Sequence, residues 1–252
     1  MKQNNRPSLL LLHGALGTLE QFDFLVPQLK EHFVVHRINF EGHGDAGPTD
    51  SPFRISYFAE NVLGYMDEHG IEAANFFGYS MGGYVALVLA KNHPQRVKKV
   101  ATLGTILQWN EKIAEQECQY LHPGKIKEKV PHFAEQLKER HLSGWERVVN
   151  NTRDMLQYLG VNPEIESEDW KHITCPLRFH IGDRDTTAGL ADTAEIYQKT
   201  EKSELVVLPK TGHPITEADK DYLMLSLEKF FNEIKKTDLD DRAQKKNGSR
   251  TE

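Results

Sequence analysis

Short apolar runs recur along the chain, with segments of mixed polarity between them. The runs predict six strands, over residues 9–13, 33–39, 74–78, 97–103, 177–182 and 204–208. The segments between them carry apolar residues at three- and four-residue intervals, which predicts helices over residues 19–32, 56–70, 81–93, 190–200 and 219–234. Strands that alternate with helices are typical of a parallel sheet. The pattern therefore predicts an α/β fold with a mostly parallel sheet and helices on both faces.

One stretch, residues 105–171, breaks this alternation. It has no good strand candidate, and its helix-like segments are rich in Lys and Glu and are interrupted by Gly and Pro. We expect a helical insertion that stands over one end of the sheet. The predicted domains are thus a core of residues 1–104 and 172–236, an insertion of residues 105–171, and a tail of residues 237–252. The tail has almost no apolar residues and is expected to be disordered.

Composition and charge narrow the possible partners. The chain has 252 residues, 38% of them hydrophobic, and a formal net charge of −6, without a basic stripe that could bind nucleic acid. The apolar run of residues 9–12 is too short for a signal peptide or a membrane span. Two cysteines without C-x-x-C spacing favour a reducing compartment. We expect a cytoplasmic protein that binds neither nucleic acid nor membrane, and its oligomeric state stays open.

Residues 78–83, GYSMGG, hold the main candidate for chemistry. The serine of this G-x-S-x-G pattern, Ser80, lies between a predicted buried strand and a predicted helix, which is the context of a nucleophile elbow. Gly78 and Gly82 would let the strand and helix approach closely. The backbone N–H of Met81, at the start of the helix, would point to a developing oxyanion. The alternative is a serine that only caps the helix in a glycine-rich turn.

A nucleophilic serine needs a base and an acid that orients the base. In this kind of fold the chain order is serine, acid, histidine, and each follows a strand. His213 follows the last predicted strand and is the candidate base. The segment GDRD, after the strand that ends at residue 182, offers two carboxylates, Asp183 and Asp185, as the acid.

Loops after the first two strands complete the candidate site. The backbone N–H of Ala15 is the expected second oxyanion donor, while the side chain of His13 is expected to be structural. His43 lies in the loop G-H-G after the second strand and is a candidate substrate contact, although a structural role in that loop is the favoured alternative. Tyr79 and Trp109 are the other candidate substrate contacts.

Five motifs in this order resemble the α/β-hydrolase fold family: HGALG, GHG, GYSMGG, CPLRFHIGDRD and GHP. The resemblance spans nearly the whole predicted core. It implies a catalytic triad of Ser80, Asp185 and His213, because the family acid follows the strand-end glycine in the pattern G-x-x-D. It also implies that the insertion is the family's helical cap, placed after the sixth family strand. One departure is that residues 1–8 cannot supply the two strands that usually come first, so we expect a trimmed sheet edge.

The nucleophile position discriminates among reactions of this family. Relatives that dehalogenate alkanes or open epoxides resemble this chain but carry an aspartate where Ser80 stands. Tyr84 stands where menaquinone-pathway lyases often have an arginine, which weakens that alternative, and hydrolases of carbon–carbon bonds remain possible. The favoured function is a carboxylesterase-like serine hydrolase of a small-molecule ester or acyl substrate, without metal or other cofactor. A non-catalytic ligand receptor or scaffold on the same fold is the alternative from another class.

Overall fold

A six-stranded parallel sheet forms the centre of the computed structural model, which describes residues 6–232. The strand order is β2-β1-β3-β4-β5-β6. The strands are β1 (Ser8–Leu12), β2 (Val34–Ile38), β3 (Ala74–Tyr79), β4 (Val97–Leu103), β5 (Leu177–Gly182) and β6 (Ser203–Leu208). They confirm the six predicted strands, with ends that differ by at most one residue. The predicted tail, residues 237–252, lies outside the described residues.

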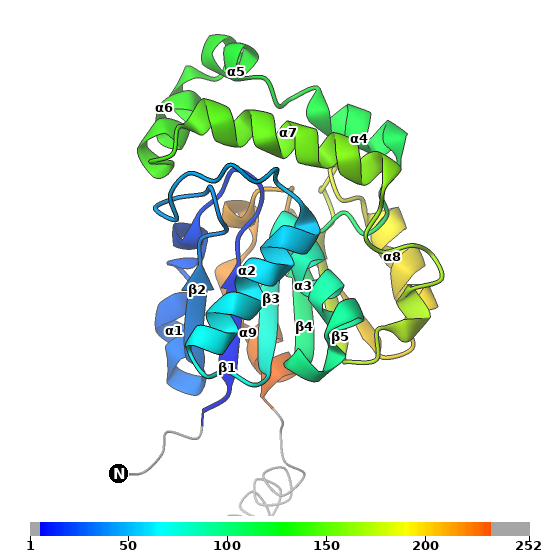
Figure 1. Cartoon of the computed structure of the whole chain (residues 1–252). Helices are drawn as coiled ribbons and strands as arrows, with labels where there is room; N and C mark the ends of the chain where they lie inside the picture. The colour runs from blue at the N-terminus through cyan, green and yellow to red at the C-terminus, as the bar shows by residue number, and fades with distance from the viewer. Residues whose placement is uncertain (1–5, 233–252) are drawn as a thin grey trace, which may run out of the picture.

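Both faces of the sheet are covered by helices (Figure 1). Because side chains alternate along a strand, Leu9 and Leu11 of β1 join one apolar cluster and Leu10 and Leu12 join the other. The first cluster includes α1 (Val26–His32) and α9 (Lys220–Phe231). The second includes α2 (Ile55–Glu68), α3 (Met81–Asn92) and α8 (Leu190–Lys199). Burial on two faces explains why β1 is an apolar run, whereas the edge strands β2 and β6 are less buried and carry more polar residues.

A layer of helices stands over the carboxyl ends of the strands (Figure 1). These helices lie between β4 and β5 and are α4 (Glu111–Cys118), α5 (Pro123–Lys129), α6 (Pro131–Arg140) and α7 (Trp145–Val161). Trp145 and Met155 of α7 are buried in the same apolar cluster as α2 and α3. The layer thus shares a core with the sheet, while its Lys and Glu side chains lie mostly outside. The division into core and cap domains stays a prediction.

Four short 3₁₀ helices complete the described residues. They are η1 (Leu19–Phe22), η2 (Pro94–Arg96), η3 (Trp170–His172) and η4 (Ile215–Glu217). Two of them, η1 and η4, follow β1 and β6 and begin close to the loops that carry Ala15 and His213.

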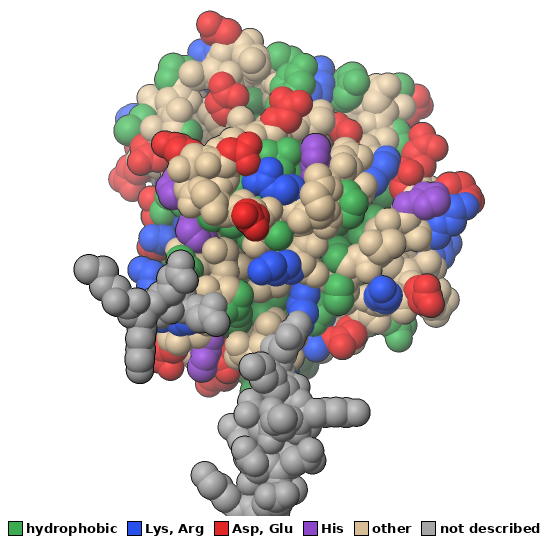
Figure 2. Space-filling model, turned by 60° about the horizontal axis from the view of Figure 1, so that its bottom comes forward, with side chains coloured by type: hydrophobic (Ala, Val, Ile, Leu, Met, Phe, Trp, Pro, Cys, Tyr) green, Lys and Arg blue, Asp and Glu red, His purple; other side chains and the backbone are tan. Residues whose placement is uncertain are grey.

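The surface at the amino ends of the strands carries charges of both signs. Figure 2 shows acidic and basic side chains interspersed there, not gathered by sign. Among residues 6–232, no helix is both long and apolar enough to cross a bilayer. Cys118 and Cys175 are both free thiols.

A buried histidine joins β5 to its neighbours in the core. The Nδ1 atom of His180 lies 2.9 Å from the Thr102 carbonyl oxygen and its Nε2 atom lies 2.8 Å from the Ser226 hydroxyl. A carbonyl oxygen can only accept, so the proton of the neutral ring is on Nδ1 and Nε2 accepts from Ser226. Burial lowers the pKa of His180 from 6.5 to about 4, and its hydrogen bond to the Thr102 carbonyl offsets part of this effect.

This depressed pKa predicts a loss of stability in mild acid. The unfolded chain takes up a proton at His180 near pH 6.5, whereas the folded chain resists protonation until about pH 4. The contribution is therefore fully present above pH 6.5 and is lost as the pH falls towards 4. We expect His180 to account for about 2 kcal/mol of the loss in unfolding free energy between pH 7 and pH 5.

Urea denaturation of the wild type and His180→Gln at both pH values measures this contribution. The variant should lose less unfolding free energy on acidification by about that amount, whatever its stability at pH 7. Equal losses in the two proteins would show that His180 does not couple folding to protons.

Candidate active site

Ser80 occupies the turn between β3 and α3 in a strained conformation. Its φ of 50° and ψ of −119° lie in a region that residues with a side chain rarely adopt. The Ser80 N–H donates to the Leu103 carbonyl at 2.8 Å, and the Thr105 hydroxyl donates to the Ser80 carbonyl at 3.0 Å. These bonds to the end of β4 and the residues after it hold the turn. Hydrogen bonds to the neighbouring chain segment therefore hold Ser80 in its strained conformation.

Two glycines allow the backbone packing that this turn requires. A Cβ at Gly82 would lie 2.0 Å from the Leu12 carbonyl oxygen, and a Cβ at Gly78 would lie 2.4 Å from the Gly82 carbonyl carbon. Both distances are far below van der Waals contact, and the opposing atoms are backbone. The start of α3 thus packs directly against the ends of β1 and β3, as expected for Gly78 and Gly82 from the sequence.

Three predicted side chains lie in a hydrogen-bonded chain at the carboxyl ends of the strands. The Ser80 hydroxyl oxygen lies 3.2 Å from Nε2 of His213. On the other side of the ring, Nδ1 of His213 lies 3.0 Å from Oδ2 of Asp185. Asp185 follows β5 and His213 follows β6, so three separate strands supply the three groups. The structure brings together Ser80, His213 and Asp185.

The carboxylate of Asp185 is almost fully enclosed, with 1% of its side chain exposed. Its Oδ1 accepts the backbone N–H groups of Thr187 and Ala188, both at 2.9 Å. Burial by itself raises the pKa of Asp185, but hydrogen bonds from His213 and from these two amides outweigh it and leave the pKa lowered. Asp185 therefore stays ionised beside the imidazole.

Asp183 has a different position from Asp185. It is exposed, and its Oδ1 accepts the Thr211 N–H at 3.1 Å. Hydrogen bonds from the backbone of Lys210 and Thr211 lower its pKa. Asp183 thus braces the loop that leads to His213 and makes no contact with the imidazole. The geometry separates the two carboxylates between which the sequence left a choice.

The loop after β1 lies opposite the serine. A Cβ at Gly14 would lie 2.8 Å from the Tyr79 ring, and Leu16 has a φ of 57°. The Gly14 N–H donates to the side chain of Gln21 at 2.9 Å, which ties this turn to η1. Among the described residues, no acceptor takes the N–H of Ala15 or of Met81. Both groups are free to bind an oxygen atom in the cavity.

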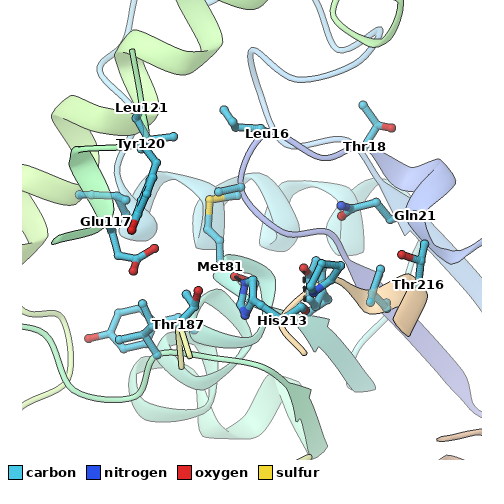
Figure 3. Close-up of a pocket in the computed structure, with 18 of the residues that line it drawn as sticks. Leu16, Thr18, Gln21, Met81, Glu117, Tyr120, Leu121, Thr187, His213 and Thr216 are labelled. Carbon is cyan, nitrogen blue, oxygen red and sulfur yellow. Dashed lines mark hydrogen bonds between the residues drawn. The ribbon is translucent and has the colours of Figure 1, made fainter. Parts of the chain in front are cut away.

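A cavity of about 800 Å³ opens between the helical layer and the carboxyl ends of the strands. Ser80, His213, Ala15 and Met81 all line it. Figure 3 shows Met81 and His213 at its floor, below side chains that reach down from the helical layer.

Two of the three predicted substrate contacts, Tyr79 and Trp109, also line the cavity. The Tyr79 hydroxyl donates to the His213 carbonyl at 3.1 Å, so this ring also supports the histidine. Burial raises the pKa of Tyr79 to about 12, which keeps the hydroxyl protonated. The Nε1 atom of Trp109 is buried and has no partner among the described residues.

His43 does not line the cavity, so its candidacy as a substrate contact is wrong, and its burial agrees with the structural role that the sequence favoured. Its ring is fully buried and stacks on Phe53 at 4.9 Å between ring centroids. The ring centroids of His13 and His43 lie 5.1 Å apart, and Nε2 of His13 accepts the Phe40 N–H. Burial lowers the pKa of both histidines, that of His13 to about 4. These neutral rings pack the two loops together below the site.

One charged residue of the cavity was missed in the sequence. Glu117 of α4 lines the cavity, although the Lys and Glu side chains of the helical layer lie mostly outside. A signal was present in the spacing. Glu117 lies three residues after Ala114 and directly before Cys118, both of which are buried. A carboxylate on the inward face of an amphipathic helix is unusual enough to have marked it.

Comparisons with known proteins support the fold described above. A family model described as alpha/beta hydrolase fold matches residues 7–122. The chain is 31% identical over 131 residues to a pimeloyl-[acyl-carrier protein] methyl ester esterase of Edwardsiella ictaluri, covering 52% of this chain and 46% of the relative. It is 36% identical over 105 residues to the dihydrolipoyllysine-residue acetyltransferase component of an acetoin cleaving system of Cupriavidus necator, covering 42% of this chain and 28% of the relative. The matches thus span less than half of these relatives' lengths.

A solved structure matches over most of the chain. It is a 2-hydroxy-6-oxo-6-phenylhexa-2,4-dienoate hydrolase from a Rhodococcus species, with a TM-score of 0.73 and 24% identity, covering 91% of this chain and 92% of that chain. The sheet order, the helical layer after β4 and the turn at Ser80 define an α/β-hydrolase fold. With the family model that matches residues 7–122, they show that the chain has the α/β-hydrolase fold.

The backbone contact at Gly82 predicts a large effect of a single methyl group. Gly82→Ala would force its Cβ against the Leu12 carbonyl and should lower the unfolding free energy by about 3 kcal/mol or more, as overpacked core sites do. Gly64→Ala is the matched control, because Gly64 lies within α2 and its Cβ would meet no atom within 4 Å. This control should gain about 0.5–1 kcal/mol from helix propensity.

Thermal and urea unfolding of the two variants give the comparison. Opposite signs are expected for the two changes in stability. A Gly82→Ala protein as stable as the wild type would mean that α3 does not pack against β1 in the way described.

Proposed function

We propose that the protein is a serine hydrolase that cleaves a small-molecule carboxylic ester through an acyl-enzyme intermediate. The observation that carries the proposal is the chain of contacts from Ser80 through His213 to Asp185 at a strained strand-to-helix turn. A capping serine would not need such a turn. The side chain of Ser80 also makes no capping hydrogen bond to α3. Relatives named as esterases support the same class of reaction.

In the first half of the reaction, the Ser80 oxygen attacks the ester carbonyl carbon while its proton moves to Nε2 of His213. The Nδ1 proton of His213 stays hydrogen-bonded to Asp185, whose negative charge stabilises the imidazolium. The carbonyl oxygen becomes an oxyanion, and the N–H groups of Ala15 and Met81 are positioned to bind it. The tetrahedral intermediate then collapses. The alcohol leaves with the proton from Nε2, and the acyl group remains on Ser80.

In the second half, a water molecule takes the place of the alcohol. It gives a proton to Nε2 of His213 and attacks the acyl carbon, and collapse of the second intermediate returns the proton to Ser80 and releases the carboxylic acid. Every proton that leaves an oxygen is returned to one, so the cycle needs no metal and no redox group.

The Asp185 and His213 contacts also bear on the non-catalytic alternative. A ligand receptor on this fold needs the cavity but has no use for a buried carboxylate aimed at a histidine beside the serine. Enclosing Asp185 costs free energy that a binding function alone does not require. The 2-hydroxy-6-oxo-6-phenylhexa-2,4-dienoate hydrolase of the structural comparison shares the fold with this chain, and turnover of its named substrate would test the alternative of carbon–carbon bond hydrolysis.

Ser80→Ala should abolish ester hydrolysis without unfolding the protein. Removing the nucleophile of a triad lowers kcat by about 10⁶-fold in a serine protease, and the hydroxyl packs no core. The measurement is turnover of p-nitrophenyl butyrate together with covalent labelling by a fluorophosphonate. Ser56→Ala is the control, because Ser56 lies at the start of α2 and does not line the cavity. Labelling that persists in Ser80→Ala would place the nucleophile elsewhere.

The two neighbouring carboxylates should differ in their effects on kcat. Asp185→Asn would remove the charge beside Nδ1 and should lower kcat by about 10⁴-fold, as in a serine protease triad. Asp183→Asn should lower it by less than about tenfold, since an amide oxygen can still accept the Thr211 N–H. Both variants are measured with the same ester, and a reversed ranking would overturn the assignment of the acid.

A further inference from the structure

Glu117 is a carboxylate in the cavity that makes no contact to balance its charge. It lies on α4, is half-buried, and lines the cavity with Ser80 and His213. Among the described residues, no hydrogen bond or ion pair engages its carboxylate. Figure 3 shows its side chain reaching from the helical layer into the cavity, on the side of Thr187. A carboxylate in this position is available to a ligand.

The electrostatic surroundings of Glu117 place its charge close to the reacting groups. Burial raises its pKa, while the charge of His213 lowers it and the charge of Asp185 raises it. The carboxylate of Glu117 is thus partly desolvated, and the charges of His213 and Asp185 act on it across the cavity. A charged group of a bound substrate would interact with Glu117 in the same weakly screened space.

The other charged residues that line the cavity are all exposed. They are Glu20, Asp23 and Arg140. Asp23 is also paired with Arg37. Charges in contact with solvent are screened strongly, so their influence on a substrate inside is weaker than that of Glu117.

Much of the remaining wall is aromatic. Trp109, Tyr120 and Phe133 line the cavity with Glu117, and Tyr120 lies beside Glu117 in Figure 3. Aromatic faces attract cations and do not attract carboxylates. The combination of one unpaired carboxylate with aromatic faces therefore favours one sign of charge in the bound molecule.

We propose that Glu117 selects ester substrates that carry an ammonium group, which it pairs with inside the cavity, and that it disfavours esters that carry a carboxylate. This inference rests on the proposed function and names the substrate class of the same site. It assigns no part of the bond-breaking chemistry to Glu117.

The test uses esters that differ only in charge. One set is p-nitrophenyl esters whose acyl chains end in a methyl, an ammonium or a carboxylate group. A second set is butyrate esters of alcohols that end in the same three groups. Their hydrolysis is monitored by the release of acid. The two sets cover the possibility that the charge sits on either side of the scissile bond.

The wild type should hydrolyse the ammonium ester of at least one set with a kcat/KM about tenfold or more above that of the carboxylate ester. Glu117→Gln, which keeps the shape and removes the charge, should bring this ratio to within about threefold. The neutral ester should change by less than about threefold. Raising the ionic strength should shrink the wild-type ratio only weakly.

Two matched variants control for charge elsewhere. Glu115→Gln removes an exposed carboxylate from the same helix, and Arg140→Gln removes the exposed cation that lines the cavity. Both should keep the wild-type preference. A preference that follows Arg140 and not Glu117 would overturn the proposal.

The outcomes separate this inference from the proposed function. Failure of the wild type to hydrolyse any neutral ester or to react with fluorophosphonate would overturn the proposed function, and the inference with it. Normal hydrolysis of the neutral ester without a charge preference in either set would overturn the inference alone. An equal loss on all three esters in Glu117→Gln would also overturn it, because it would indicate a role in the chemistry or the fold.

Discussion

The close approach of the α3 amino terminus to the ends of β1 and β3 is the constraint on which the rest of the site depends. A backbone carbonyl of β1 occupies the space in which a side chain at Gly82 would stand. This contact brings the Met81 N–H near the loop after β1, and it forces Ser80 into a left-handed conformation. In this conformation the Ser80 hydroxyl points away from the sheet, towards His213. One packing contact thus determines the positions of both the candidate nucleophile, Ser80, and one of the expected oxyanion donors, the Met81 N–H.

Polar contacts beneath the site hold its loops at the same edge of the sheet. Asp183 accepts the Thr211 N–H ahead of His213, and the Tyr79 hydroxyl donates to the His213 carbonyl. These bonds use groups that would otherwise be costly to bury or leave unpaired. The imidazole is therefore held from both sides of its own loop, and its position does not rely on the contact with Asp185 alone.

The sequence predicted the parts of the fold that depend on local pattern. Short apolar runs located all six strands, most clearly β1 and β3, which are buried on both faces, and the glycines around Ser80 marked the turn. The choice between Asp183 and Asp185 came from resemblance, because both stand past the strand end and only loop geometry separates them. The role of His43 was left open for a similar reason, since a histidine in a glycine-rich loop can point to the cavity or into the core. Packing against Phe53 decides between these two orientations. The two residues are close in the sequence, but no sequence pattern predicts their contact.

The helical layer is where prediction from sequence was weakest, and the reason is physical. Strand ends in a parallel sheet converge on one edge, so residues that follow strands can be assigned to the site without knowing tertiary contacts. Helices of an inserted layer have no such fixed geometry, and a Lys- and Glu-rich pattern shows only that most of their surface meets water. Glu117 is therefore ambiguous in the sequence, whereas in the structure its half-buried charge has no partner among the described residues. A desolvated charge without a partner lowers stability. A cationic group that entered the cavity would offset this cost, so the proposed selection of substrate belongs to the helical layer above the triad and not to the triad itself.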